Sequence, residues 1–145
     1  MLNVIKPTSG MSVAVVGAGA VGLAAIMALK TLDQPPSQII ALDIVAHRLE
    51  MARSFGATHT VNSKEQPDLK KVLMDITSGR GVDGAIDTTG RPEVVTELIR
   101  SAARKGKVVT VGVGEVRCKT TQWDIKTLTR PTSFRQRLLP TCSRW

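Results

Sequence analysis

The stretch SVAVVGAGAVGLAAIMALK, residues 12–30, decides the fold of this chain. A run of β-branched apolar residues meets three glycines, and a long apolar segment without a helix breaker follows them. This order predicts a buried strand over 13–16, a tight turn and a helix over 20–32. One face of that helix has apolar residues at the spacing i, i+3, i+4, i+7, and we expect it to pack on the strand: Val21, Ala24, Ala25 and Ala28.

The same alternation of strand and helix continues along the chain. Further strands are predicted over 38–43, 59–62 and 107–113, and VDGAIDTTG, residues 82–90, is predicted to be a fourth strand and its exit. Helical spacing lies between them, around 45–52, 69–76 and 95–102, with Gly56 and Gly106 closing the first and the last of these helices. Because parallel neighbouring strands need crossover helices, the pattern predicts an α/β fold with a Rossmann-type, doubly wound parallel sheet.

Length and composition are those of one globular domain. The chain has 145 residues, of which 42% are hydrophobic, and this is long enough to bury a core. The sequence contains no apolar run of about 18 residues and no apolar segment after a basic N-terminus. We therefore expect a cytoplasmic protein without a membrane partner. Two cysteines, Cys118 and Cys142, make neither a disulfide framework nor a zinc site.

The basic charge of the chain is concentrated near its C-terminal end. Of a formal net charge of +8, residues 117–145 hold 7 basic against 1 acidic side chain, while residues 1–116 hold 13 against 11. We predict a Rossmann domain over 1–116 and a basic, irregular or incomplete tail over 117–145. A nucleic-acid contact through that tail is the less favoured interpretation, because basic clusters are common and unspecific.

The three glycines have the spacing of a dinucleotide-binding motif. Gly17, Gly19 and Gly22 form G-x-G-x-x-G directly between strand and helix, and Asp43 ends the second strand, where a ribose-binding acid is expected. In such a motif the first glycine allows the turn, the second lets the backbone approach a pyrophosphate, and the third lets the helix lie close to the sheet. A tight turn without a ligand is the alternative.

Asp43 also bears on the choice of cofactor. A carboxylate accepts hydrogen bonds from ribose hydroxyls but repels a 2′-phosphate, and Ile44 follows rather than an arginine. This favours NAD over NADP. Asp43 could instead cap the next helix, which is compatible with ribose binding.

Four segments occur in the order and spacing of a known family: VAVVGAGAVGLAAIMALK, DIVAHRLEMARSFGA, GVDGAIDTTG and GKVVTVGV. Over roughly residues 4–116 the chain resembles the cofactor-binding domain of the medium-chain, zinc-type alcohol dehydrogenases. The segments GATHTVN and DTTG are most similar to the aryl or benzyl alcohol dehydrogenase branch. The resemblance implies NAD as cofactor and, in a complete enzyme, hydride transfer between an alcohol or aldehyde and NAD, with zinc polarising the oxygen.

The resemblance also implies roles for single residues. Arg48 matches a basic position that reaches the adenosine ribose, although a solvated helix residue is the alternative. The threonines after the fourth strand match a wall of the adenine and ribose pocket, and the exit of the fifth strand matches backbone that faces the nicotinamide. Asp87 is interpreted as a structural hydrogen-bonding residue. The predicted cofactor-binding residues are Gly17, Gly19, Ala20, Val21, Gly22, Asp43, Arg48, Thr88, Thr89, Val111, Gly112 and Val113.

The chain departs from the family in two places. The family's zinc ligands come from a separate N-terminal domain, and His47 and His59 are scattered across elements that give no reason to converge. We therefore expect a fragment with no catalytic and no metal-binding residues, inactive when alone. The sequence after residue 116 lacks the pattern of a sixth, last strand, which would leave the fifth strand as an edge open to self-association.

Other functions also fit a glycine motif. A non-catalytic nucleotide-binding or interaction module would share it. A methyltransferase also has a glycine loop and an acid, but the strict motif and GVDGAIDTTG argue against that class. A short-chain dehydrogenase would need a catalytic tyrosine, and the sequence has no tyrosine.

Overall fold

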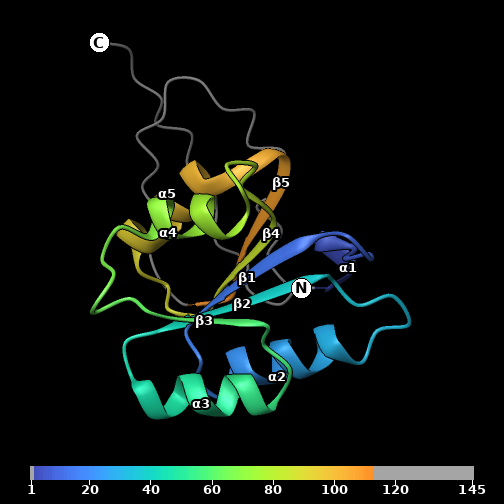
Figure 1. Cartoon of the computed structure of the whole chain (residues 1–145), viewed down its shortest axis with the longest axis horizontal. Coiled ribbons are helices and arrows are strands. Elements are labelled where there is room, and N and C mark those ends of the chain that lie inside the picture. The colour runs from blue at the N-terminus through green and yellow to red at the C-terminus, as the bar shows by residue number, and fades with distance from the viewer. Residues whose placement is uncertain (1, 113–145) are drawn as a thin grey trace, which may run out of the picture.

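Strands and helices alternate along residues 2–112, the part of the chain that the computed structural model describes (Figure 1). A one-turn helix, α1 (Leu2–Ile5), comes first and was not predicted from the sequence. The elements that follow are β1 (Ser12–Val16), α2 (Ala20–Lys30), β2 (Gln38–Asp43), α3 (Ala46–Ser54), β3 (His59–Asn62), α4 (Leu69–Ile76), β4 (Val82–Asp87), α5 (Pro92–Ser101) and β5 (Ala102–Thr110).

The five strands form one parallel sheet in the order β3-β2-β1-β4-β5. Helices α2 and α3 cover one face of the sheet, and α4 and α5 cover the other (Figure 1). This confirms the predicted Rossmann-type, doubly wound α/β fold. The chain winds outward on both sides of β1, and the reversal between β1 and β4 opens a crevice at the carboxyl ends of the strands. The predictions of a tail and of a missing sixth strand concern residues outside the described range.

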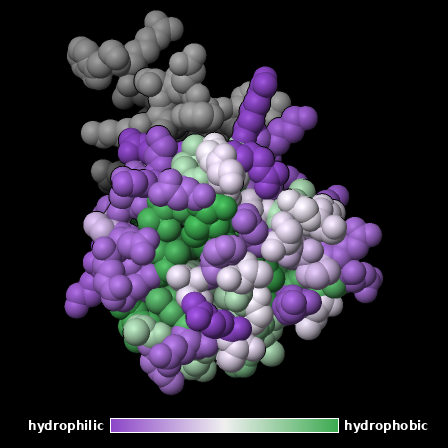
Figure 2. Space-filling model, viewed as in Figure 1, coloured by the Kyte–Doolittle hydropathy of each residue, from purple (hydrophilic) through white to green (hydrophobic). Residues whose placement is uncertain are grey.

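Alternate residues of the central strands supply two separate cores. In β1, Val13 and Val15 pack on the side of α2, whereas Ala14 and Val16 pack on the side of α4 and α5. All five residues of β1 are buried, which explains its continuous apolar run. Most of the surface in Figure 2 is hydrophilic, with a hydrophobic area on the face where α4 and β3 lie.

The buried face of α2 differs from the predicted one. Val21 is 47% exposed and Ala24 is exposed, because the helix turns another set of residues to the sheet: Gly22, Ala25, Ile26 and Leu29. The helix is apolar on all sides, so its 3.6-residue period does not select a face. Gly22 selects it, since a Cβ at this position would overlap the carbonyl oxygen of Gly17.

Strand β5 begins five residues earlier than predicted. Ala102 and Gly106, which were assigned to the preceding helix, both lie in the strand. Ala102 pairs with Val82, and a bulge separates this pair from the regular pairing that starts at Gly84 and Lys107. Gly106 serves this bulge rather than a helix end, because a Cβ there would come within 2.6 Å of the Val82 carbonyl oxygen.

The two glycines of the motif should differ in their effect on stability. We expect Gly22→Ala to lower the free energy of unfolding by about 1–3 kcal/mol, because the new methyl group meets backbone that cannot move away easily. The matched control is Gly19→Ala, where no atom lies within 4 Å of the added Cβ. Its cost should stay below about 1 kcal/mol. Urea unfolding followed by circular dichroism measures both, and equal losses would contradict the close packing of α2.

Candidate functional site

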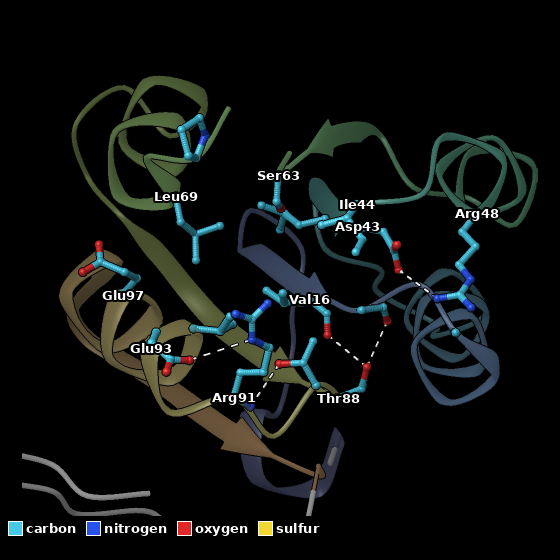
Figure 3. Close-up of a pocket in the computed structure, with 16 residues that line it drawn as sticks. Val16, Asp43, Ile44, Arg48, Ser63, Leu69, Thr88, Arg91, Glu93 and Glu97 are labelled. Atoms are coloured by element: carbon cyan, nitrogen blue, oxygen red, sulfur yellow. Dashed lines mark hydrogen bonds and ion pairs between the residues drawn. The ribbon is translucent and has the colours of Figure 1, made fainter. Parts of the chain in front are cut away.

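A cavity of about 490 Å³ opens at the carboxyl ends of β1, β2 and β4 (Figure 3). Its walls come from the turn over residues 17–19 between β1 and α2, called the glycine turn below, and from the strand ends, the segment before α4 and the first turns of α5. Six predicted residues line it: Gly17, Gly19, Asp43, Arg48, Thr88 and Thr89. Ten further residues line it without having been predicted: Val16, Leu42, Ile44, Ser63, Pro67, Leu69, Arg91, Glu93, Val94 and Glu97.

The glycine turn presents bare backbone at one end of the cavity. Gly17 has a φ of +90°, a conformation that glycine adopts without strain. Gly19 is the N-cap residue of α2, and no side chain caps the first N–H groups of this 11-residue helix. The space beside Gly19 is open, since nothing lies within 4 Å of an added Cβ. An uncapped helix start beside open space is suited to bind an anion.

Asp43 holds the glycine turn from the side of β2. Its buried carboxylate accepts hydrogen bonds from the N–H groups of Ala18, 2.7 Å from Oδ2, and Val45, 2.9 Å from Oδ1. The Leu42 carbonyl oxygen accepts a further bond, 2.8 Å, from the Gly17 N–H. The N-cap residue of α3 is Val45, so the capping alternative for Asp43 is wrong. Asp43 shapes the turn in addition to lining the cavity.

Thr88 holds the same turn from the side of β4. Its hydroxyl lies 3.0 Å from the carbonyl oxygens of Val16 and Gly17, to which it donates (Figure 3). The Thr89 hydroxyl donates to Oδ1 of Asp87 at 2.6 Å. Both hydroxyl groups are therefore engaged within the protein, and the two threonines form a fixed wall of the cavity.

Charged side chains of both signs surround the cavity. Nη1 of Arg48 lies 3.9 Å from Oδ2 of Asp43, and Nε of Arg91 lies 3.8 Å from Oε2 of Glu93 (Figure 3). Glu97 adds a third carboxylate. The sequence held a signal for Arg91, because it directly follows the quoted DTTG segment, whereas the glutamates reach the cavity through the placement of α5.

Five of the remaining predicted residues lie within the described range and do not line this cavity. Two of them pack backbone on backbone, since a Cβ at Gly22 would overlap Gly17 and one at Gly112 would overlap Gly90. Ala20 and Val21 form the exposed first turn of α2, Val111 donates its N–H to the Asp87 carbonyl oxygen at 2.7 Å, and Val113 lies outside the described residues.

Within residues 2–112, no three side chains of the types His, Cys, Asp or Glu gather closely enough to hold a metal ion. Nδ1 of His47 lies 3.8 Å from Glu50, while Nδ1 of His59 bonds with the Thr58 hydroxyl. Over the same range, no helix has the length and apolar character needed to cross a bilayer.

Comparisons with known proteins place this geometry in a family. Residues 20–137 match the zinc-binding dehydrogenase family. The chain belongs to this family. It is 39% identical over 108 residues to sorbitol dehydrogenase of Bacillus subtilis, a match that covers 74% of this chain and 30% of that protein.

Solved structures agree with this assignment. Zinc dependent alcohol dehydrogenase 2 from Streptococcus pneumonia is 38% identical, with a TM-score of 0.75 over 81% of this chain and 34% of that one. Benzyl alcohol dehydrogenase from Acinetobacter calcoaceticus is 40% identical, with a TM-score of 0.72 over 86% of this chain and 33% of that one. The predicted resemblance to the cofactor-binding domain of the zinc-type alcohol dehydrogenase family is confirmed. It spans about 30% of the length of the curated relatives it matches.

Asp43 should contribute to stability even without a cofactor. We expect Asp43→Asn to lower the free energy of unfolding by about 1–3 kcal/mol. The NH₂ group of asparagine would face one of the two backbone N–H groups that donate to the carboxylate, so that one hydrogen bond is lost. The control is Asp68→Asn, since exposed Asp68 accepts one N–H bond, from Lys71, at the start of α4. Asparagine caps equally well there, so urea unfolding should show a change below about 0.5 kcal/mol. Similar losses in both variants would show that the buried bonds of Asp43 are not special.

Proposed function

We propose that the cavity binds NAD(H), with the pyrophosphate at the start of α2 and the adenosine ribose at Asp43. One observation carries this proposal: the uncapped start of α2 and a buried carboxylate border the same cavity. The cofactor, when bound, supplies the nicotinamide carbon that accepts or donates a hydride.

The glycine turn would hold the pyrophosphate. The open space at Gly19 lets phosphate oxygens approach the backbone, and the N–H groups of Ala20 and Val21 belong to the uncapped first turn of α2. No acidic residue occupies that turn to repel an anion. These two residues therefore retain a predicted role through their backbone, although their side chains do not line the cavity.

Asp43 and Arg48 would hold the ribose. Each carboxylate oxygen of Asp43 accepts one backbone N–H, and each keeps capacity for a second bond from a ribose hydroxyl. The half-exposed Arg48 reaches the same carboxylate from the solvent side. The ribose would thus be bound by a group that the fold has already oriented.

An apolar wall would receive the adenine ring. Ile44 directly follows Asp43 and is 60% exposed, although it is a large apolar residue. It borders the cavity together with half-buried Val94 and buried Leu69, so a flat base placed there would cover the apolar surface that Ile44 exposes to water.

The charges of the cavity favour NAD over NADP. Three carboxylates line it, those of Asp43, Glu93 and Glu97, and the two arginines each lie beside one of them. A 2′-phosphate would meet the Asp43 carboxylate directly. We expect calorimetry on the full chain to give an NAD dissociation constant of roughly 0.1–1 mM and NADP binding at least about tenfold weaker. NADP binding as tight as NAD binding would contradict the proposed ribose site.

The activity of a complete enzyme would be oxidation of an alcohol or reduction of an aldehyde. The family membership and the benzyl alcohol dehydrogenase structure support this reaction class, with aromatic alcohols as the first substrates to try. Among residues 2–112, no three His, Cys, Asp or Glu side chains gather closely enough to hold a zinc ion that would activate the hydroxyl of such a substrate. Self-association through the edge of the sheet and a cytoplasmic location stay predictions from the sequence.

The purified chain should therefore not oxidise alcohols by itself. The test supplies NAD, zinc, and benzylic and aliphatic alcohols, and follows the absorbance of the reduced nicotinamide. No steady turnover is expected, because cofactor binding alone does not activate the alcohol oxygen. Steady turnover that disappears in Gly19→Val would show that catalytic groups within this chain had been overlooked.

A further inference from the structure

The carboxylate of Asp87 is buried without a cationic partner. The residue ends β4, has no exposed surface and does not line the cavity. Among residues 2–112, the ion pairs formed by Lys, Arg and His side chains leave it out. A carboxylate removed from water is costly unless other donors replace its hydration, so its position requires an explanation.

Four neutral donors replace that hydration. Oδ1 of Asp87 accepts bonds from the N–H and the hydroxyl of Thr89, at 2.9 and 2.6 Å. Oδ2 accepts bonds from the N–H of Gly90 and the hydroxyl of Thr110, both at 3.0 Å. Because donors face both oxygens, the position demands an acceptor on each side, and an amide would turn its NH₂ group toward two of them.

These donors belong to two different segments. Thr89 and Gly90 form the turn after β4, while Thr110 is the last residue of β5. The backbone adds a further link, since the Val111 N–H donates to the Asp87 carbonyl oxygen at 2.7 Å. Asp87 thus joins the turn after β4 to the exit of β5.

The bonding continues into the wall of the cavity. The Thr89 hydroxyl, which donates to Asp87, lies 3.3 Å from the N–H of Arg91 and accepts its bond. The side chain of Arg91 lines the cavity. On the other side, Thr88 donates to the carbonyl oxygen of Gly17 in the glycine turn. Fixing Thr89 therefore restrains Thr88, directly before it, and Arg91, two residues after it, and both of these residues line the cavity.

We propose that Asp87 is a positioning residue for the cofactor. It keeps residues 88–91 in the shape that receives NAD, and it does so without touching the cavity. This inference rests on the proposed function, because it concerns the same cavity. Its consequence is that loss of the carboxylate weakens NAD binding even in protein that is fully folded.

Asp83 supplies a matched control on the same strand. It lies near the opposite end of β4, accepts bonds from the Ser12 N–H at 2.8 Å and from Arg80 at 3.1 Å, and does not line the cavity. We expect Asp87→Asn to raise the NAD dissociation constant on the order of tenfold, and Asp83→Asn to change it less than about twofold. Calorimetry on the full chain measures both constants, at a temperature where circular dichroism shows each variant folded. An unchanged constant in Asp87→Asn would overturn the inference.

Thr110 provides a milder test should Asp87→Asn fail to fold. Thr110→Val keeps the shape of the side chain and removes one of the four donors, whereas Thr110→Ser keeps the hydroxyl. We expect a rise of about threefold or more in the NAD dissociation constant for valine and a value near that of the original chain for serine. Equal constants in the two variants would refute the positioning role. If the unaltered chain binds no NAD, the proposed function itself fails, whereas NAD binding that these variants leave unchanged rejects this inference alone.

Discussion

The contact between α2 and the glycine turn is the constraint on which the rest of the site depends. Because a Cβ at Gly22 would overlap the carbonyl oxygen of Gly17, the helix begins closer to the sheet than any side chain allows. This closeness brings the uncapped N–H groups of α2 to the carboxyl ends of the strands, where the cavity lies. The N–H of Gly17 is at the same time bonded to the Leu42 carbonyl oxygen, so the turn is fixed relative to β2.

Two buried carboxylates support this arrangement in similar ways. Asp43 ends β2, Asp87 ends β4, and each accepts the N–H of the residue two positions further on, at 2.9 Å. Each also bonds with a neighbouring segment: Asp43 with the N–H of Ala18, and Asp87 with the hydroxyl of Thr110. The crevice of the doubly wound sheet is thus lined by turns that are tied to one another. Of the two carboxylates, only Asp43 lines the cavity, and this difference separates ribose binding from positioning.

Much of this fold could be predicted from periodicity and turn chemistry. The strands over 38–43 and 59–62 have the predicted bounds, and helical spacing was predicted around 69–76, where α4 lies, because apolar runs and breakers mark these segments. Hydrophobic periodicity did not predict which face of α2 is buried. Helix α2 is apolar all round, so its buried face depends on Gly22 meeting Gly17, a contact between backbones that no hydropathy pattern records. The bulge at the start of β5 depends on pairing with Val82, twenty residues away in sequence.

Several residues at strand ends were predicted to line the cavity, and Arg48 on α3 was predicted through the family resemblance, whereas the residues from α5 were not predicted. Gly17, Asp43 and Thr88 follow or end strands, whereas Glu93 and Glu97 reach the cavity because α5 packs against β4 and β5 beside it. The structure adds a point about energetics. The carboxylates and threonine hydroxyls around the turns already have hydrogen-bond partners within the protein, so their positions are fixed before a ligand binds. A site formed in advance loses little conformational freedom on binding, which is the condition for a short set of backbone contacts to hold a dinucleotide.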